Sequence, residues 1–260
     1  MPGSVWLILI LALAIALAEF SRRVVKNARQ DVIWGMALMV AGWYVRAVHN
    51  LRIVGAENIP GSGGHRRTIL VVNHTAGIDP ILVQAACPFE IRWMMASDMQ
   101  VGFLRWAWDW LEVINVDRFG RDTSAIRRAL RHLANGGVVG IFPEGAIERP
   151  PRQVLPFHPG VGLLAARSGA QVLPVVVDGT PQVDHAWSSL FRRSRSTIRF
   201  LPPVRYGNRP AAEITEDLRR RYIDWTGWPA NDQPRFREGP GKDATGGHVR
   251  SRLRHDTLGA

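Results

Sequence analysis

Short apolar runs alternate with amphipathic segments from about Leu51 to Trp225, and this alternation limits the possible folds more than any other feature of the chain. Residues 68–72 (TILVV) and 137–142 (GVVGIF) have the length and composition of buried strands, whereas residues 122–134 place apolar side chains on one helical face and arginines on the other. Strands that alternate with helices predict an α/β domain, with a mixed, mostly parallel sheet flanked by helices.

The same patterns place the other elements and the end of the domain. Further strands are expected at 92–95, 113–116, 172–177 and 196–201, the last as an edge strand that ends at Pro202-Pro203. Helices are expected from Asp79-Pro80, with Asp79 as the N-cap, and over 160–168 and 214–225. Residues 228–260 are rich in Pro, Gly, Asp, Arg and Asn, which predicts a polar, disordered tail.

Two apolar runs of fourteen residues, Val5–Ala18 and Val32–Val45, precede this domain. Each is shorter than the ~20 residues that a helix needs to cross the hydrocarbon core. We therefore expect residues 1–48 to form a helical hairpin that anchors the chain to the cell membrane, with at most one span. The basic connector between the runs indicates the cytoplasmic side, so the main domain (49–227) is expected there too. Two alternatives stay open: a signal peptide cleaved after Ala18, which lacks the usual basic start, and a pair of core helices.

The charge and the cysteine content bear on partners and location. A formal net charge of +11 favours anionic partners such as nucleic acid, anionic lipid or coenzyme A. The basic residues are spread over several elements and form no recognisable nucleic-acid motif, so we expect a membrane surface as partner and no nucleic acid. The single cysteine, Cys87, cannot form an intrachain disulfide and suits a reducing, cytosol-facing location.

A histidine and an aspartate separated by four residues, His74 and Asp79, follow the strand at 68–72. In α/β sheets, ligands gather at the carboxyl ends of strands. The spacing lets the carboxylate of Asp79 fold back onto one imidazole nitrogen, so that the other nitrogen can accept a proton from a hydroxyl. No G-x-S-x-G nucleophile is present, which predicts direct transfer to a substrate hydroxyl without a covalent enzyme intermediate. The plainer alternative is a surface histidine beside an aspartate that only caps a helix.

Four short blocks, in order over residues 51–204, resemble the lysophospholipid acyltransferase family. They are Asn73-His74-x4-Asp79-Pro80, Val113–Arg118, Phe142-Pro143-Glu144-Gly145 and Val172–Val177. The resemblance implies a glycerol-phosphate acyltransferase-like fold, with 49–227 as the acyltransferase domain. It also implies transfer of a fatty acyl group from acyl-CoA or acyl carrier protein to a lysolipid hydroxyl, most directly from 1-acylglycerol-3-phosphate to phosphatidate in phospholipid biosynthesis. No metal ion, and no cofactor besides the acyl donor, is implied.

The resemblance assigns a role to each matching residue. His74 would be the general base and Asp79 its orienting partner. Arg118 would bind the phosphate of the acceptor through charge-assisted hydrogen bonds, although a solvated charge at a strand end is the plain alternative. Phe142, Pro143, Glu144 and Gly145 would shape the acceptor site, with Gly145 allowing close backbone approach. The plain alternative is that these four residues only form a turn.

The chain departs from the family pattern at two places. Ala146-Ile147 follow the third block where the family usually continues Thr-Arg, and Ala96 stands where a lysine is common. Both departures remove groups expected at an acceptor phosphate, which Arg149, Arg152 or His158 could replace. We therefore keep open a different acceptor, a glycolipid or an amino-acid-containing lysolipid. A separate hypothesis is a non-catalytic membrane-surface protein that binds anionic lipid.

Overall fold

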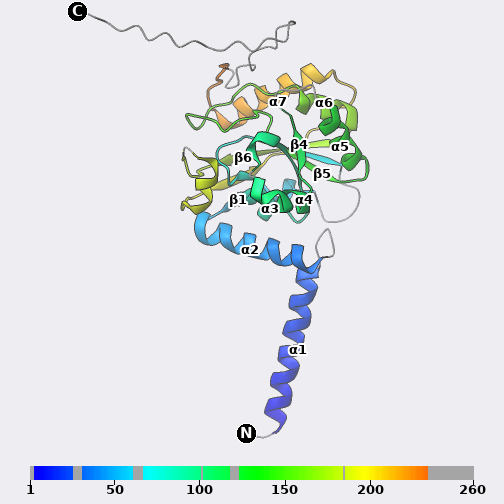
Figure 1. The fold of residues 1–260 in the computed structure, drawn as a ribbon, viewed down its shortest axis with the longest axis vertical. Coiled ribbons are helices and arrows are strands. Elements are labelled where there is room, and N and C mark those ends of the chain that lie inside the picture. The colour runs from blue at the N-terminus through cyan, green and yellow to red at the C-terminus, as the bar shows by residue number, and fades with distance from the viewer. Residues whose placement is uncertain are drawn as a thin grey trace, which may run out of the picture.

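A computed structural model of the chain describes residues 3–25, 31–60, 67–100, 102–117, 123–183 and 185–233. Within these ranges seven strands form one sheet, in the order β1-β7-β6-β2-β5-β3-β4 (Figure 1). From β6 to β4 neighbouring strands run parallel, β7 runs antiparallel to β6, and β1 runs parallel to β7. The prediction of a mixed, mostly parallel sheet is therefore confirmed. The strands are β1 (Arg52–Val54), β2 (Thr68–Val72), β3 (Arg92–Ala96), β4 (Ile114–Val116), β5 (Val138–Ile141), β6 (Gln171–Asp178) and β7 (Thr197–Phe200).

The strand expected at the edge of the sheet, β7, lies inside it. β7 pairs with β6 on one side and with β1 on the other, and its Ile198 and Phe200 are buried. The expectation was wrong because the true edge strand, β1, has only three residues, all exposed, and its sequence Arg-Ile-Val carries no apolar run that could reveal it.

Helices cover both faces of the sheet and explain the alternation of its side chains. Ile69 and Val71 of β2 point into a core with α5 (Thr123–Ala134), α6 (Gly160–Ser168) and α7 (Ala211–Thr226). Leu70 and Val72 point into a second core with α2 (Val32–His49) and α3 (Asp79–Ala86). A strand covered on both faces reads as a continuous apolar run, as residues 68–72 do. The short elements are η1 (Ala56–Asn58), η2 (Ser97–Met99), η3 (Gly102–Leu104), α4 (Arg105–Trp110) and η4 (Ala186–Phe191).

A buried tyrosine on α7 completes the pairing of the two central strands. Pro174 of β6 is in register with Val71 of β2, and proline has no N–H to donate to a ladder. The hydroxyl of Tyr222 inserts at this point: it accepts from the backbone N–H of Val175 at 3.0 Å and donates to the carbonyl of Val71. The side chain of Tyr222 is completely buried. The strand that leads to His74 is thus joined to its neighbour through a side chain as well as through the backbone.

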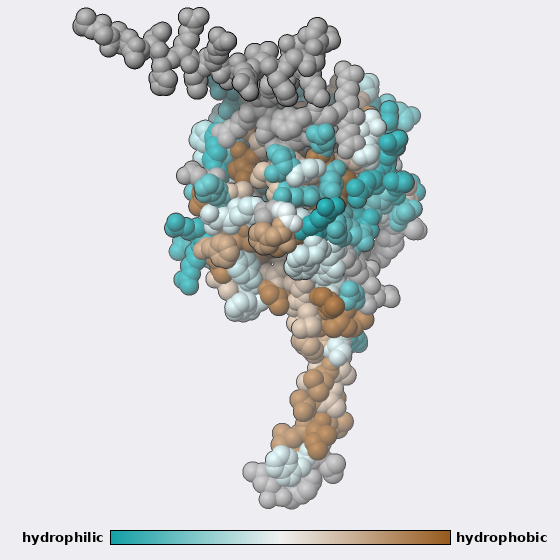
Figure 2. All heavy atoms as spheres, viewed as in Figure 1, coloured by the Kyte–Doolittle hydropathy of each residue, from teal (hydrophilic) through white to brown (hydrophobic). Residues whose placement is uncertain are grey.

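The two apolar runs at the N-terminus form two helices, and residues 26–30, the connector of the expected hairpin, lie outside the described residues. Figure 1 shows α1 (Gly3–Val25) projecting away from the domain, while α2 lies crosswise beneath it, and Figure 2 shows α1 as a largely hydrophobic stalk. With 23 residues α1 is longer than its apolar run, about 34 Å at 1.5 Å per residue. Within the described ranges α2 is long and apolar enough to cross a membrane, although a buried core helix or a signal sequence could have the same length and composition.

The described chain continues past the end of α7. Residues 228–233 return to the domain, where the N–H of Asn231 donates to the carbonyl of Val154 at 3.0 Å and Trp228 packs against the core. Most of the tail that we predict to be disordered, residues 234–260, lies outside the described residues.

Candidate active site

Two neighbouring parallel strands, β2 and β5, end side by side and deliver the first and third sequence blocks to one place. Asn73 follows β2 and extends its pairing with β6. Its side-chain amide donates to the carbonyl of Val177 at 3.0 Å, and its amide oxygen accepts from the N–H of Val177 at 2.8 Å. This pair of hydrogen bonds fixes the backbone immediately before His74, so the imidazole begins from a rigid support.

The side chains of His74 and Asp79 meet as their spacing predicts. Nδ1 of His74 lies 2.9 Å from Oδ2 of Asp79. Asp79 is the first residue of α3 and not its N-cap, a position that Ile78 occupies without a side-chain hydrogen bond. Its carboxylate instead accepts from the backbone N–H groups of Thr75 at 2.7 Å and Ala76 at 2.9 Å, and from the hydroxyl of Thr75 at 3.1 Å.

These contacts fix the tautomer of the histidine. The completely buried carboxylate of Asp79 accepts only, so Nδ1 must carry the proton that joins the two side chains. Nε2 is then left with a lone pair, and among the described residues it has no hydrogen-bond partner. The side chain of His74 is 17% exposed, so this nitrogen remains accessible. An imidazole held in this way can take a proton from a hydroxyl and is stabilised when it becomes charged.

Two aromatic rings hold the face of the imidazole. The ring of His74 stacks on that of Phe142, with centroids 4.2 Å apart, and Phe142 stacks on Trp93 of β3, with centroids 5.0 Å apart. Phe142 therefore lies against the imidazole of His74, and its predicted part in the acceptor site stays a prediction. Trp93 was not among the predicted site residues, since it lies 49 positions from Phe142 in the sequence, in a strand that gives no catalytic signal.

Glu144 contacts the loop between β2 and α3, residues 73–78, which we call the histidine loop because it carries His74. It is buried, and its carboxylate accepts from the N–H of His74 and from the N–H of Leu155, both at 3.3 Å. Burial, followed by the nearby Glu148, raises its pKa well above the ordinary value. Glu144 thus supports the backbone of His74, and its predicted part in the acceptor site stays a prediction.

The rest of the third block forms a tight turn. Pro143 is buried, and its carbonyl accepts from the N–H of His158 at 2.7 Å. Gly145 has φ +63, and an added Cβ would lie 2.8 Å from the ring of His158. Glycine is required here both by the backbone conformation and by the close approach of that ring.

The loop after this turn supplies two contacts that sequence reasoning missed. The N–H of Glu148 donates to the carbonyl of His74 at 2.8 Å, so neighbouring segments hold both backbone groups of the histidine. Glu148 is completely buried, and burial raises its pKa to about 7. The guanidinium of Arg149 donates to the carbonyls of Thr75 and Val183, at 2.9 Å each. The sequence after the third block gave no signal for these contacts of Glu148 and Arg149, because the contacts depend on the path of the loop.

The proposed replacements for the missing phosphate contacts are now placed. Arg149 uses its guanidinium on backbone carbonyls, and Arg152 forms an exposed ion pair with Asp178 at 3.1 Å. His158 is exposed beside Gly145. Arg118, the residue predicted to bind the phosphate, lies outside the described residues, just after the end of β4.

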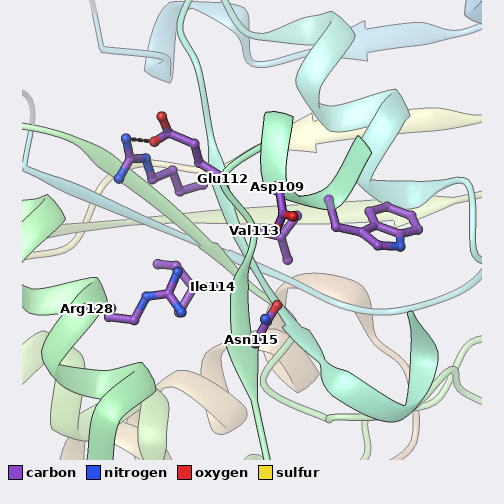
Figure 3. A pocket seen from close by; sticks show the side chains of 8 residues that line it. Asp109, Glu112, Val113, Ile114, Asn115 and Arg128 are labelled. Carbon is purple, nitrogen blue, oxygen red and sulfur yellow. Dashed lines mark ion pairs between the residues drawn. The ribbon is translucent and has the colours of Figure 1, made fainter. Parts of the chain in front are cut away.

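A polar cavity of about 330 Å³ lies elsewhere on the domain, between β3, α4, β4 and α5 (Figure 3). Arg92 and Arg128 line it, but Glu112 forms an ion pair with Arg92, and neither His74 nor Asp79 reaches it. We therefore locate the chemistry at the histidine loop and not in this cavity. Within the described ranges, no three His, Cys, Asp or Glu side chains are grouped as metal ligands.

Comparison with known proteins finds acyltransferases similar to this chain. A family model described as Acyltransferase matches residues 50–178, which hold the first and third blocks. The 1-acyl-sn-glycerol-3-phosphate acyltransferase of Borreliella burgdorferi is 30% identical over 132 residues, 49% of this chain and 51% of that protein. The enzyme of the same name from Bacillus subtilis is 24% identical over 182 residues, 66% of this chain and 85% of that protein. The chain thus spans about half the length of the first relative and most of the second.

A solved structure shares the fold. The crystal structure of the 1-acyl-sn-glycerophosphate (LPA) acyltransferase PlsC from Thermotoga maritima superposes with a TM-score of 0.55 at 20% identity. The match covers 72% of this chain and 78% of that one. The predicted resemblance to lysophospholipid acyltransferases is confirmed by these findings.

Proposed function

Since residues 50–178 match the family model described as Acyltransferase, we propose that the chain moves a fatty acyl group from a thioester, acyl-CoA or acyl carrier protein, to the hydroxyl of 1-acylglycerol-3-phosphate. The observation that carries this proposal is the pair formed by His74 and Asp79, with Nδ1 held at 2.9 Å and Nε2 open. The name shared by both curated relatives supports this acceptor.

The reaction follows from the geometry of the pair. Nε2 of His74 takes the proton of the acceptor hydroxyl as its oxygen attacks the thioester carbonyl. Asp79 stabilises the imidazolium that forms. When the tetrahedral intermediate collapses, the C–S bond breaks, the new C–O ester bond remains, and the imidazolium returns its proton to the leaving thiolate. No bond forms between enzyme and acyl group, and the products are a diacyl lipid and a free thiol.

A membrane location suits this chemistry, because the acceptor and the product are lipids. We propose that α1 anchors the chain, with the catalytic domain on the cytoplasmic side. The side chains of α1 from Ile8 to Leu17 are largely exposed and apolar, a surface that is unfavourable in water. The basic residues Arg22 and Arg23 at its end support the cytoplasmic orientation.

The structure also gives a reason to consider acceptors other than lysophosphatidate. Arg149 and Arg152 are occupied by carbonyls and by Asp178, and Ala146-Ile147 offer no charge. A glycolipid or an amino-acid-containing lysolipid needs fewer phosphate contacts than lysophosphatidate does. The chemistry at His74 would be the same for both classes.

An acceptor panel tests the proposal. Full-length protein in lipid vesicles receives one radiolabelled acyl-CoA and, separately, lysophosphatidate, a lyso-glycolipid and an amino-acid-containing lysolipid, with protein-free vesicles as background. We expect label chiefly in phosphatidate. Preference for another lysolipid would replace the acceptor and keep the chemistry. Label in none of them, with acyl carrier protein also tried as donor, would favour a lipid-binding protein without catalysis.

A further inference from the structure

A basic and aromatic corner stands out at the end of η4, outside the active site. We use this name for Phe191, Arg192, Arg193 and Arg195. The side chain of Phe191 is 86% exposed, and the three arginines are exposed. Among the described residues none of these arginines has an ion pair. An exposed apolar ring beside three exposed arginines indicates a partner that is both apolar and anionic.

The corner is fixed to the C-terminal end of α2. The hydroxyl of Tyr44 donates to the carbonyl of Leu190, and Nδ1 of the buried His49 lies 2.8 Å from the hydroxyl of Ser194. The N–H of Ser194 also donates to the carbonyl of Val48 at 3.2 Å. These bonds join Leu190 and Ser194, which lie on either side of Phe191, Arg192 and Arg193, to α2. The corner is therefore attached to this helix.

The outer face of α2 continues this surface. Ile33, Met36, Val40 and Trp43 are spaced by three or four residues, which places them along one side of the helix, and all are exposed. Figure 1 shows α2 lying across the base of the domain, with η4 above its C-terminal end and α1 leaving from the other end. In the same view, Figure 2 shows hydrophilic and hydrophobic residues side by side at that edge of the domain.

We infer that the corner docks on an anionic lipid bilayer, with Phe191 in the interfacial region and Arg192, Arg193 and Arg195 against headgroup phosphates. A bilayer fits better than a protein groove, because the corner is attached to the end of α2, a helix with an exposed apolar stripe, and the apolar stalk of α1 leaves from the other end of that helix. Arginines near an anionic leaflet gain electrostatic attraction that falls off within a Debye length. The inference rests on the membrane association proposed above but not on the acyl transfer.

Docking at the corner would also fix the distance between the active site and the membrane surface. The inner face of α2 packs against α3, and α3 begins at Asp79. With α1 alone as anchor, a single attachment point would not fix the orientation of the domain relative to the membrane. Contact at the far end of α2 supplies a second attachment point, which holds α2 along the membrane surface and keeps the His74–Asp79 pair near the lipid phase.

Site-directed fluorescence tests this inference on the full chain in proteoliposomes. Cys87 is buried and burial raises the pKa of its thiol, so a new surface cysteine can be labelled selectively. An environment-sensitive fluorophore is placed on Phe191→Cys, on Arg220→Cys at the exposed side of α7, and on Leu9→Cys in α1. Quenching by nitroxide lipids is measured in vesicles with and without phosphatidylglycerol.

We expect the label at 191 to shift to the blue and to be quenched in anionic vesicles, while the label at 220 is not. Quenching at 9 but not at 191 would overturn the inference and leave the α1 anchor standing. Absence of quenching at both 9 and 191 would contradict the membrane association itself. Equal quenching at 191 in neutral and anionic vesicles would overturn the recognition of headgroup charge.

A charge-matched pair of variants isolates the arginines. Replacing Arg192, Arg193 and Arg195 with Gln in the labelled protein should abolish the extra quenching at 191 in anionic vesicles. The control removes the same charge from three exposed arginines of α5, Arg127, Arg128 and Arg131. If both triple variants lose quenching equally, net charge and not the corner is responsible, and the inference fails.

Discussion

Replacing Asp79 with Asn probes the catalytic pair with the least disturbance to its surroundings. Oδ2 of Asp79 accepts three N–H groups, from His74, Thr75 and Ala76, whereas Oδ1 accepts only the hydroxyl of Thr75. The amide oxygen of Asn should therefore take the place of Oδ2. Its NH2 group then faces the hydroxyl of Thr75, which can accept because its own proton can go to Thr180, 2.7 Å away.

The expected loss can be estimated from what this exchange removes. The tautomer of His74 is kept, since Nδ1–H still donates to an oxygen, but the imidazolium loses its negative partner. A hydrogen bond to a charged group contributes roughly 1–2 kcal/mol more than one between neutral groups. That difference corresponds to a fall in kcat of about 5- to 30-fold.

Replacing Asp79 with Ala should act differently. The buried N–H groups of Thr75 and Ala76 lose their acceptor, at about 1–3 kcal/mol each. The sum is a substantial part of the ~5–15 kcal/mol that stabilises a typical domain. Asp79→Ala should therefore lower the thermal midpoint clearly, and by more than Asp79→Asn, which keeps an acceptor for both N–H groups.

The assay measures kcat and KM with lysophosphatidate and an acyl-CoA, alongside thermal unfolding of each variant. A wild-type kcat in Asp79→Asn would refute the stabilisation of the imidazolium by Asp79. A loss of the order of 10⁴, the size seen when the wrong histidine tautomer is imposed, would mean that the amide is flipped and the assignment of its oxygen is wrong.

Three further predictions concern the supports of the site. Burial raises the pKa of Glu148 to about 7, so the protonated form favours folding: this contribution is full below the ordinary value of 4.5 and is lost as pH rises through about 7. Glu148→Gln should therefore flatten the fall in thermal midpoint between about pH 5 and pH 8, and an unchanged profile would exclude Glu148 as its source. Tyr222→Phe removes the hydroxyl between Val175 and Val71 and should cost about 1–3 kcal/mol in urea unfolding, whereas an unchanged free energy would mean that the strands close over the gap. Arg149→Ala should lower kcat with little change in the KM of the acceptor, because its guanidinium holds backbone carbonyls, while a rise in KM alone would make Arg149 a phosphate ligand.

Local patterns were sufficient to predict most elements from the sequence. β2 and α6 have the predicted bounds, because an unbroken apolar run and a short apolar segment ending at Gly169 are unambiguous. β1 gave no pattern, and its position next to β7 depends on a register between residues 52–54 and 197–199 that only the folded chain defines.

The contacts of the candidate site also fall into those that the sequence could predict and those that it could not. Phe142 joins the site because β5 pairs with β2, although β3 and β4 lie between these two strands in the chain, and nothing in the sequence indicated that pairing. The contact of His74 with Asp79 could be inferred from their spacing. The contacts of Glu144, Glu148 and Arg149 with the histidine loop could not, because they use backbone groups, which are the same at every residue and leave no signal in the sequence.

Acyl transfer by His74→Ala, measured against the wild type under single-turnover conditions, tests the central claim most directly. The protein is reconstituted in vesicles, and formation of the labelled diacyl lipid is followed together with release of the free thiol. The account predicts that both rates fall together by about 10²–10⁴, the usual contribution of a general base, while the variant still unfolds cooperatively above the assay temperature. Transfer at a rate near that of the wild type would contradict it, since no other described group is placed to take the proton of the acceptor.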